Sequence, residues 1–241
     1  NSYGRDLYGE PRFADVLRAV DAAGIERLRF ATSHPKDLTD EVIGLFATLP
    51  SLMPALHLPV QSGSNRILSA MNRRYTREHY LGLIEKLRRA RPDIALSTDI
   101  IVGFPGETEE DFMDTYRLVE EVGYSQVFTF IYSKREGTPA AEMDDDTPRE
   151  VIQERFDRLV DLVQRKAFEA NQAELGATVP VLVEGTSKRD DSILAGKSPK
   201  NQTVHAPVPA GADAASLVGR IVPVTIEEAR TWYLSGTIVH A

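Results

Sequence analysis

Apolar residues follow two different spacings along the first two thirds of the chain. Helical spacing, with apolar positions three and four apart, predicts helices at 12–23, 39–49, 65–71, 76–90 and 108–122. Short runs rich in β-branched and aromatic residues lie between them and predict strands at 27–31, 55–60, 96–102 and 126–132. Strands that alternate with helices in this way pair in parallel, so the fold class is α/β with a parallel sheet.

The segment 97–112 is the most informative part of this series. Its β-branched strand stops at Gly103-Phe104-Pro105-Gly106, and Thr108 follows as the N-cap of an acidic helix start. Glycines here would let the backbone approach a ligand at the carboxyl end of the strand, where parallel α/β barrels hold their active sites. An ordinary turn between a strand and a helix is the alternative.

Four predicted strands are too few to close a six- or eight-stranded barrel. An open four-stranded sheet would fit this number, and so would an incomplete barrel. The chain starts at Asn1 without an initiator methionine, so we expect it to be a piece of a longer protein.

The last third of the chain has a different composition. A long helix is predicted from Thr147, with Pro148 at its second position, to about residue 175. After Gly176 come short β-rich runs at 178–183, 193–195, 202–206, 217–226 and 234–240, and the Ala-rich segment 210–216 reads as a surface loop. We therefore predict two domains, a partial parallel barrel over 1–175 and a small antiparallel β-barrel over 176–241.

Composition narrows the chemistry. The 241 residues contain no cysteine and carry a formal net charge of −8. Disulfides, thiolate nucleophiles and sulfur-ligated metals are therefore excluded for these residues, and indiscriminate binding to nucleic acid is disfavoured. No apolar run is long enough to span a membrane, and the expected location is the cytoplasm.

Polar or glycine-rich loops follow all four predicted strands, at 32–35, 61–64, 103–107 and 132–138. In a parallel barrel these loops meet at one mouth, which predicts a ligand site there. Asp99, inside the third strand, is costly to bury unless it is paired, so we expect it to contact a cofactor. We expect His57 to be a core histidine, Glu107 to brace its turn, and 144–146 to form a solvated loop. His34 is compatible with bonding its own loop or with touching a ligand.

Two local basic patches lie in the second domain of this acidic chain. Lys188 and Arg189 form the first, and Lys197, Lys200 and Asn201 belong to the second. With Trp232 or Tyr233 as a stacking surface, these residues predict RNA binding, while a solvated hairpin is the alternative.

Three long runs carry a family resemblance: 56–64 (LHLPVQSGS), 99–108 (DIIVGFPGET) and 130–140 (FIYSKREGTPA). Together with 1–4 and 32–35, they make the chain similar, from end to end, to the radical S-adenosylmethionine (SAM) methylthiotransferases. Residues from about 176 resemble the TRAM domain that closes these enzymes. Ser62 and Gly63 after Gln61 favour the branch that modifies dimethylallyladenosine in tRNA over the branch that modifies a ribosomal protein.

The resemblance implies strands three to six of an incomplete, TIM-like radical SAM barrel, followed by TRAM. It also implies SAM and two 4Fe–4S clusters as cofactors, although the cysteines that hold such clusters are absent from this chain. The residues that it places at the cofactor or the mouth of the barrel are Gln61, Ser62, Ser97, Asp99, Gly103, Phe104, Pro105, Tyr132, Ser133 and Arg135.

The implied reaction begins with reduction of SAM to a 5′-deoxyadenosyl radical. The radical abstracts hydrogen from a modified adenine beside the anticodon, sulfur enters there from a donor that these residues do not identify, and a second SAM methylates the sulfur. The expected partner is the tRNA anticodon stem-loop, with no membrane involved. Without cluster cysteines, the 241 residues alone are expected to be inactive. The alternatives are a ribosomal-protein methylthiotransferase and a non-catalytic RNA-binding module.

Overall fold

The computed structural model describes residues 2–144 and 147–239. The chain divides into two compact units, Asn1–Val163 and Gln164–Ala241. Helix α7 (Arg149–Gln172) crosses this division in the sequence. The predicted long helix, 147–175, is therefore present with slightly narrower bounds.

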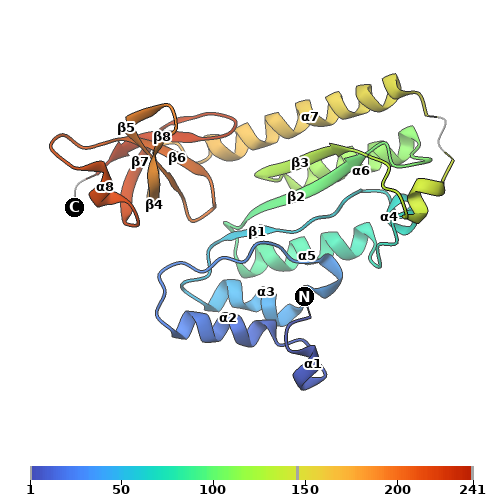
Figure 1. Ribbon diagram of the computed structural model, residues 1–241, viewed down its shortest axis with the longest axis horizontal. Helices are drawn as coiled ribbons and strands as arrows, with labels where there is room; N and C mark the ends of the chain where they lie inside the picture. Colours follow the sequence, from blue (N-terminus) through green and yellow to red (C-terminus); the bar gives the residue numbers. More distant parts are fainter. Residues whose placement is uncertain (1, 145–146, 240–241) are drawn as a thin grey trace. The chain divides into compact units, whose positions relative to one another are not determined.

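The first unit contains a parallel sheet of three strands in the order β1-β2-β3 (Figure 1). The strands are β1 (Ala55–His57), β2 (Ala95–Val102) and β3 (Gln126–Ile131). The helices are α1 (Arg5–Tyr8), α2 (Phe13–Ala22), α3 (Asp40–Thr48), α4 (Asn65–Ala70), α5 (Arg77–Ala90) and α6 (Glu109–Val122), with 3-10 turns η1 (Pro35–Asp37) and η2 (Pro139–Glu142). The predicted parallel α/β fold is confirmed.

Strand β2 separates the two faces of this sheet. Leu96, Thr98, Ile100 and Val102 are buried, and the apolar members of this set belong to the core built with the helices. Ser97, Asp99 and Ile101 alternate with them and point to the other face. The register places His57 opposite Ser97, Phe128 opposite Asp99, and Phe130 opposite Ile101. These six residues (His57, Ser97, Asp99, Ile101, Phe128 and Phe130) form what we call the inner face.

The strand predicted at 27–31 is not formed, so the prediction of a fourth strand is wrong. Only Leu28 makes a bridge, to Leu52. The ladder stops there because Pro54 has no N–H to donate and the N–H of Ala55 bonds locally to the Met53 carbonyl, 2.8 Å away.

The strand predicted at 55–60 is also shorter than expected, because Pro59 interrupts its ladder. Side chains replace the missing backbone bonds. Thr98 Oγ1 donates to the Leu58 carbonyl at 3.0 Å and accepts from the Val60 N–H at 2.9 Å. The Tyr80 hydroxyl also donates to Leu58, at 3.0 Å. Since buried polar groups need partners, these bonds hold the irregular segment against the sheet and fix the loop that follows it.

The second unit contains a small closed barrel with strand order β4-β5-β6-β8-β7 (Figure 1). Its elements are β4 (Thr178–Ser187), β5 (Asp190–Lys197), β6 (Thr203–Pro207), α8 (Ala214–Leu217), β7 (Ile221–Ala229) and β8 (Leu234–Ile238). The pairs are antiparallel except β6–β8, which is parallel. The predicted small β-barrel is confirmed, with this one parallel pair as an addition.

Local bounds in the barrel differ from the prediction. The segment 210–216 is not entirely a loop, because Asp213 caps the short helix α8 by accepting from the Ala215 N–H at 3.1 Å. Strand β7 starts at Ile221 rather than at Leu217. Strands β4 and β5 extend into polar residues because they pair as one hairpin, and pairing outweighs residue propensity there. The predicted end of the last strand at His240 lies outside the described residues.

Candidate functional site

The carboxyl ends of the three strands meet at one edge of the sheet. The Gln61 N–H donates to the Asp99 carbonyl at 2.9 Å, and the Ile101 N–H donates to the Gln61 carbonyl at 3.0 Å. At the neighbouring strand, the Tyr132 N–H donates to the Val102 carbonyl at 2.8 Å. The loops 61–64, 103–107 and 132–138 therefore leave the sheet at the same edge, as the sequence predicted.

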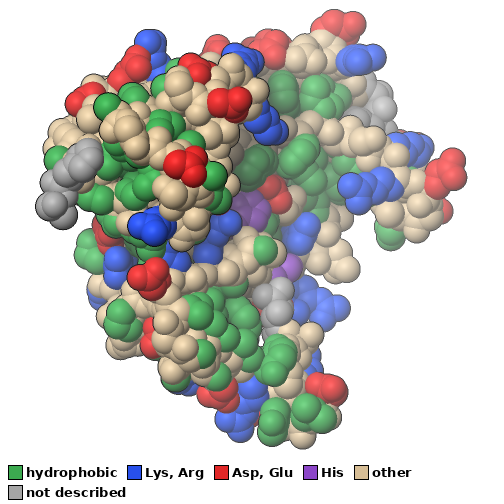
Figure 2. Space-filling model, turned by 60° about the vertical axis from the view of Figure 1, so that its left-hand side comes forward, with side chains coloured by type: hydrophobic (Ala, Val, Ile, Leu, Met, Phe, Trp, Pro, Cys, Tyr) green, Lys and Arg blue, Asp and Glu red, His purple; other side chains and the backbone are tan. Residues whose placement is uncertain are grey.

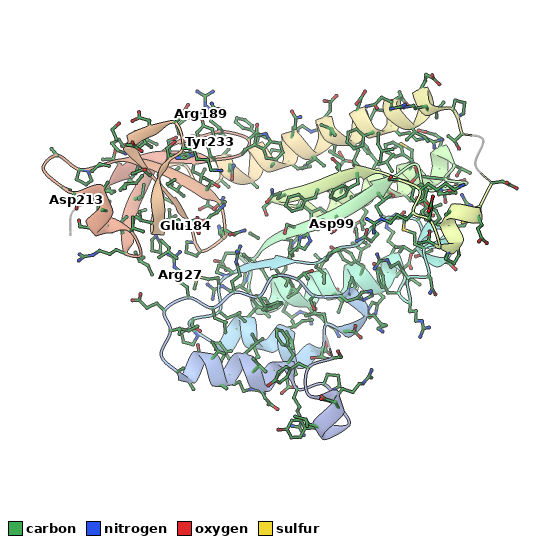
Figure 3. The ribbon with its side chains drawn as sticks, viewed as in Figure 1. Arg27, Asp99, Glu184, Arg189, Asp213 and Tyr233 are labelled. Carbon is green, nitrogen blue, oxygen red and sulfur yellow. The ribbon has the colours of Figure 1, made fainter. Side chains whose placement is uncertain are left out.

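A pocket of about 550 Å³ lies at this edge, and we call it the edge pocket. Its lining combines charged, hydroxyl, amide and aromatic groups. It is lined by Gln61, Arg73, Asp99, Ile101, Phe130, Ile131, Tyr132, Ser133, Arg135, Thr138 and Ala140. Figure 3 labels Asp99 on the sheet. Five of the ten residues predicted to contact the cofactor are thus brought together here: Gln61, Asp99, Tyr132, Ser133 and Arg135.

Gln61 and Tyr132 show features typical of ligand sites. Gln61 has a φ of 73°, in the left-handed region that non-glycine residues rarely adopt. Its backbone bonds to Asp99 and Ile101, on either side of Ile100, hold it there. The Tyr132 hydroxyl is buried and has no hydrogen-bond partner among the described residues. An unpartnered buried hydroxyl in a pocket wall is available to a bound molecule.

His57 lies on the inner face and is not a core residue, which corrects the sequence prediction. Its Nδ1 lies 3.0 Å from Ser97 Oγ, and its Nε2 lies 3.5 Å from Asp99 Oδ1. Its ring meets that of Phe128 edge-on, with centroids 5.8 Å apart. The two ring nitrogens thus orient Ser97 and Asp99. The sequence predicted a cofactor contact for Asp99, and within the described residues its carboxylate lies beside this histidine. Ser97 lies beside the edge pocket's Asp99 rather than in the lining itself.

Ser62 points away from the pocket, toward α6. It is fully buried, with its Oγ 3.2 Å from Thr115 Oγ1. The Gly63 N–H donates to the same hydroxyl at 2.9 Å, and a Cβ on Gly63 would lie 2.5 Å from the Asp114 carbonyl oxygen. The Ser62-Gly63 pair therefore packs the loop onto α6.

The turn after β2 is braced by Glu107, as predicted. Its Oε2 accepts the Gly103 N–H at 2.8 Å, and Arg155 donates to its backbone carbonyl at 2.9 Å. Gly103 has a φ of 72°, and a Cβ there would lie 2.6 Å from Ile152. Gly103 is buried and does not line the edge pocket. Burial raises the pKa of Glu107 to about 7, against the opposing effects of the Gly103 N–H and the Arg155 guanidinium.

Phe104 and Pro105 do not line the edge pocket, although both lie near Tyr132, which does. The Phe104 ring is buried and meets Tyr132 edge-on at 5.3 Å. Pro105 lines a smaller hollow, together with Tyr132 and Lys134. The Phe104 ring therefore helps to position Tyr132. Of the acidic segment 144–146, only Asp144 is described, and it is exposed; Asp145 and Asp146 lie outside the described residues.

Asp111 joins the loops that follow β1 and β2. It completes a capping box with Thr108, which confirms the predicted N-cap. Ser64 Oγ donates to Asp111 at 2.6 Å, and Arg66 pairs with it. Burial would raise the pKa of Asp111, but the hydrogen bonds from Arg66, Ser64 and Thr108 outweigh burial and hold it well below its ordinary value.

Glu107 makes the stability of the fold depend on pH. Its folded-state pKa of about 7 lies above its ordinary value of 4.5, so the folded chain keeps a proton that the unfolded chain releases. This contribution to stability is complete below about pH 4.5 and disappears as the pH rises through 7.

We expect Glu107→Gln to flatten the fall in unfolding free energy between about pH 5 and 8, by on the order of 2 kcal/mol. Urea unfolding at about pH 5 and at about pH 8 measures this fall in the free energy of unfolding for each protein. Glu110→Gln, at an exposed position, is the control, and equal slopes for wild type and Glu107→Gln would contradict the assignment.

His34 bonds its own loop. Its Nδ1 accepts from the Lys36 N–H at 3.2 Å and caps η1. Burial, then the charge of Arg73, lowers the pKa of His34. His34 does not line the edge pocket, although its neighbour Arg73 does. The described residues contain no group of three or more His, Cys, Asp or Glu that could hold a metal, and none of their helices is long and apolar enough to cross a membrane.

The predicted RNA-binding residues occupy opposite ends of β5. Lys188 and Arg189 lie in the β4–β5 hairpin and line a pocket of about 880 Å³ together with His205 and Tyr233. Figure 3 labels Arg189 and Tyr233 on the barrel. Trp232 is exposed and does not line this pocket. The barrel therefore presents Lys188 and Arg189 next to two aromatic rings, in a pocket that Glu184, Glu227 and Glu228 also line.

The second predicted patch, at the β5–β6 turn, is already engaged within the unit. Lys200 pairs with Glu174 at 2.5 Å, and Lys197 Nζ donates to Thr203 Oγ1 at 2.9 Å. Asn201 holds the turn with a φ of 66°. On the face that Figure 2 shows, Lys and Arg side chains are interspersed with Asp and Glu, so the basic residues form no continuous patch there.

Comparison with known proteins defines the class. Residues 2–119 match the radical SAM superfamily model, and residues 172–239 match the TRAM domain model. The fold is similar to that of coproporphyrinogen III oxidase (HemN) from Escherichia coli, a radical SAM enzyme, with a TM-score of 0.52 and 14% identity over 77% of this chain and 51% of that chain. Residues 2–119 therefore form a radical SAM domain, and residues 172–239 form a TRAM domain.

Two curated relatives indicate which kind of radical SAM protein this chain is similar to. The chain is 50% identical over 240 residues to the tRNA-2-methylthio-N(6)-dimethylallyladenosine synthases of Acetivibrio thermocellus and Carboxydothermus hydrogenoformans. These matches cover 99% of this chain but only 49% and 53% of the two relatives. The resemblance to the tRNA-modifying methylthiotransferases is thus confirmed, and the chain spans about half the length of the curated relatives that it matches.

Proposed function

We propose that this chain is the part of a radical SAM tRNA methylthiotransferase that holds SAM and the tRNA substrate. Similarity over 99% of the chain to enzymes named for dimethylallyladenosine in tRNA carries the proposal. The edge pocket supports it, because it lies at the carboxyl edge of a parallel sheet and has a polar lining. A ribosomal-protein substrate is disfavoured by the names of these relatives, and action on tRNA implies the cytoplasm as the location.

The residues of the edge pocket fit SAM. The cofactor is a cation with adenine, ribose hydroxyls, an amine and a carboxylate, so it needs donors, acceptors and an aromatic wall. The Gln61 amide, the Asp99 carboxylate, Ser133 and the Tyr132 hydroxyl, which has no partner among the described residues, supply the polar groups. The Tyr132 ring supplies the wall. When bound, SAM supplies a carbon-centred radical and a methyl group. The residues of this chain bind and orient it.

The chain does not fit a 4Fe–4S cluster. Cluster iron is held by cysteine thiolates, and the 241 residues contain no cysteine. Cluster ligands would have to come from outside this sequence. The chain itself contributes the edge pocket, and His57 orients Asp99 in the lining of that pocket. The same ring orients Ser97 next to it on the inner face.

The apolar half of the inner face suits the substrate base. Phe128 and Phe130 are 42% and 51% exposed, large values for phenylalanine in a sheet. They stand two residues apart on β3 and therefore point the same way. We propose that these rings cover the dimethylallyl group of the modified adenosine, whose five apolar carbons need such a surface.

The TRAM barrel is the proposed contact for the anticodon stem-loop. Lys188 and Arg189 offer phosphate contacts from a hairpin, with Tyr233 available for stacking. Lys197, Lys200 and Asn201 form a second proposed contact at the other end of β5. Transfer of a methylthio group to an RNA that carries N6-dimethylallyladenosine tests the proposed function as a whole.

We expect Lys188→Ala/Arg189→Ala to weaken binding of the chain to an anticodon stem-loop RNA. Each lost phosphate contact reduces counterion release, so the slope of log affinity against log salt should fall by about 1 per residue. Fluorescence anisotropy with a labelled RNA at several salt concentrations measures both quantities. Lys86→Ala/Arg89→Ala changes net charge equally on α5 and is the control. Equal affinity and slope in the hairpin variant would count against this contact.

A further inference from the structure

Arg73 enters the edge pocket from a loop that the proposed function has not used. It follows α4, where Asn72 adopts a left-handed φ of 56°. The Asn72 N–H donates to the Ser69 carbonyl at 2.9 Å, and the Arg73 N–H donates to the Leu68 carbonyl at 2.8 Å. This pair of bonds is a Schellman motif, which fixes the backbone of Arg73 at the helix end. The side chain is half-buried and lines the pocket with Gln61 and Asp99.

The charge of Arg73 is not neutralised by the described part of the chain. No carboxylate within residues 2–144 and 147–239 makes an ion pair with it. Its close polar neighbour is His34, with Nη1 and Nε2 3.4 Å apart. Because His34 Nδ1 accepts from the Lys36 N–H, the neutral ring carries its proton on Nε2. His34 therefore offers a second donor to Arg73 rather than an acceptor.

Charge in the edge pocket is unbalanced in the same direction. Arg73 and Arg135 bring two positive charges to its lining, and Asp99 brings one negative charge. The Asp99 carboxylate is already directed to His57 Nε2 at 3.5 Å. A half-buried guanidinium without a counterion is costly, and an anion that binds beside it removes that cost. This excess of positive charge occurs in a chain with a net charge of −8.

We propose that Arg73 is an anion-binding residue of the edge pocket, which takes a carboxylate or phosphate oxygen of the ligand. The planar guanidinium can donate two parallel hydrogen bonds to either group. The proposal rests on the proposed function, which supplies two sources of such an anion: the carboxylate of SAM and a phosphate of the RNA. Neither the family match nor the similarity to relatives assigns this role to Arg73.

The experiment compares ligands that differ in one charged group. Isothermal titration of the chain with SAM and with decarboxylated SAM gives the preference for the carboxylate. Anisotropy with an anticodon stem-loop RNA gives the salt slope. If the carboxylate is the source, Arg73→Gln lowers the preference for SAM about 10- to 100-fold, because charged hydrogen bonds contribute that much. If the phosphate is the source, the salt slope falls by about 1.

Two further variants separate binding from folding. Arg74→Gln removes the same charge from the exposed neighbouring position and should change neither quantity. Arg73→Lys keeps the charge without the guanidinium fork and should retain part of the binding. If the wild-type chain binds both ligands and Arg73→Gln binds them equally well, the role of Arg73 is overturned and the proposed function still stands. A wild-type chain that binds neither ligand would overturn both.

Discussion

The 241-residue chain alone, given iron, sulfide, a reductant, SAM and RNA under anaerobic conditions, is expected to release no 5′-deoxyadenosine. Generation of the radical from SAM requires an iron–sulfur cluster, and such clusters are held by cysteine thiolates that this chain lacks. Scattered histidines do not replace them, since the described residues contain no candidate metal-binding group. The expected effect is therefore complete loss rather than a slower rate.

Liquid chromatography with mass detection of 5′-deoxyadenosine measures this result. The control is a longer protein in which this chain is joined to a segment that supplies cluster-binding cysteines. It should release the nucleoside under identical conditions. Release of the nucleoside by the 241 residues alone, above the level of a boiled sample, would show that the chain holds a cluster without cysteine. It would refute the proposal that the cluster ligands come from outside this sequence.

Asp99→Ala in the longer protein is expected to lower methylthio transfer about 10- to 100-fold. The substitution removes a charged hydrogen-bonding group from the edge pocket, and such groups contribute about 1.5 to 3 kcal/mol. It also leaves His57 Nε2 without its acceptor at 3.5 Å, so the ring no longer has a fixed orientation. Binding of SAM and transfer to RNA should therefore fall together.

Initial rates of RNA modification at several SAM concentrations measure this effect. Asp93→Ala is the matched control, because Asp93 is exposed and pairs with Arg91 beside it. Asp99→Asn keeps the shape and should retain more activity than Asp99→Ala. Wild-type rates in Asp99→Ala would exclude Asp99 from the binding machinery.

The sequence predicts the parallel sheet well because its strands and helices have strong, regular spacing. The N-caps at Thr76 and Thr108 illustrate this, since each places a side-chain oxygen where the first turn needs an acceptor. The strand at 27–31 was mispredicted for the opposite reason. Its residues suit a strand, but its neighbour turns locally at Pro54 and offers no continuous ladder. Strand formation depends on a partner that composition does not reveal.

The site could be predicted only in part, because its irregular segments decide which side chains face the pocket. Ser62 and Gln61 are adjacent, yet the left-handed φ of Gln61 directs one to the pocket and the other to α6. His57 resembles a core residue in its apolar strand, and only the register with Ser97 places it on the inner face.

Arg73 could not be found from its local sequence. It stands in a run of charged residues after a short helix, a pattern typical of solvent-exposed loops. Its place in the pocket depends on the left-handed turn at Asn72 and on the packing of α4 beside the strand ends. Long-range placement of this kind follows from tertiary structure rather than from spacing.

The most direct test of the central claim is methylthio transfer by the longer protein that contains this chain. The protein is reconstituted anaerobically with iron and sulfide and incubated with SAM, a reductant, a sulfide source and an anticodon stem-loop RNA that carries N6-dimethylallyladenosine. Nucleoside mass spectrometry then compares this RNA with one that carries unmodified adenosine. We expect gain of one methylthio group on the dimethylallyladenosine of the first RNA only. No gain on either RNA, or equal gain on a ribosomal protein substrate, would contradict it.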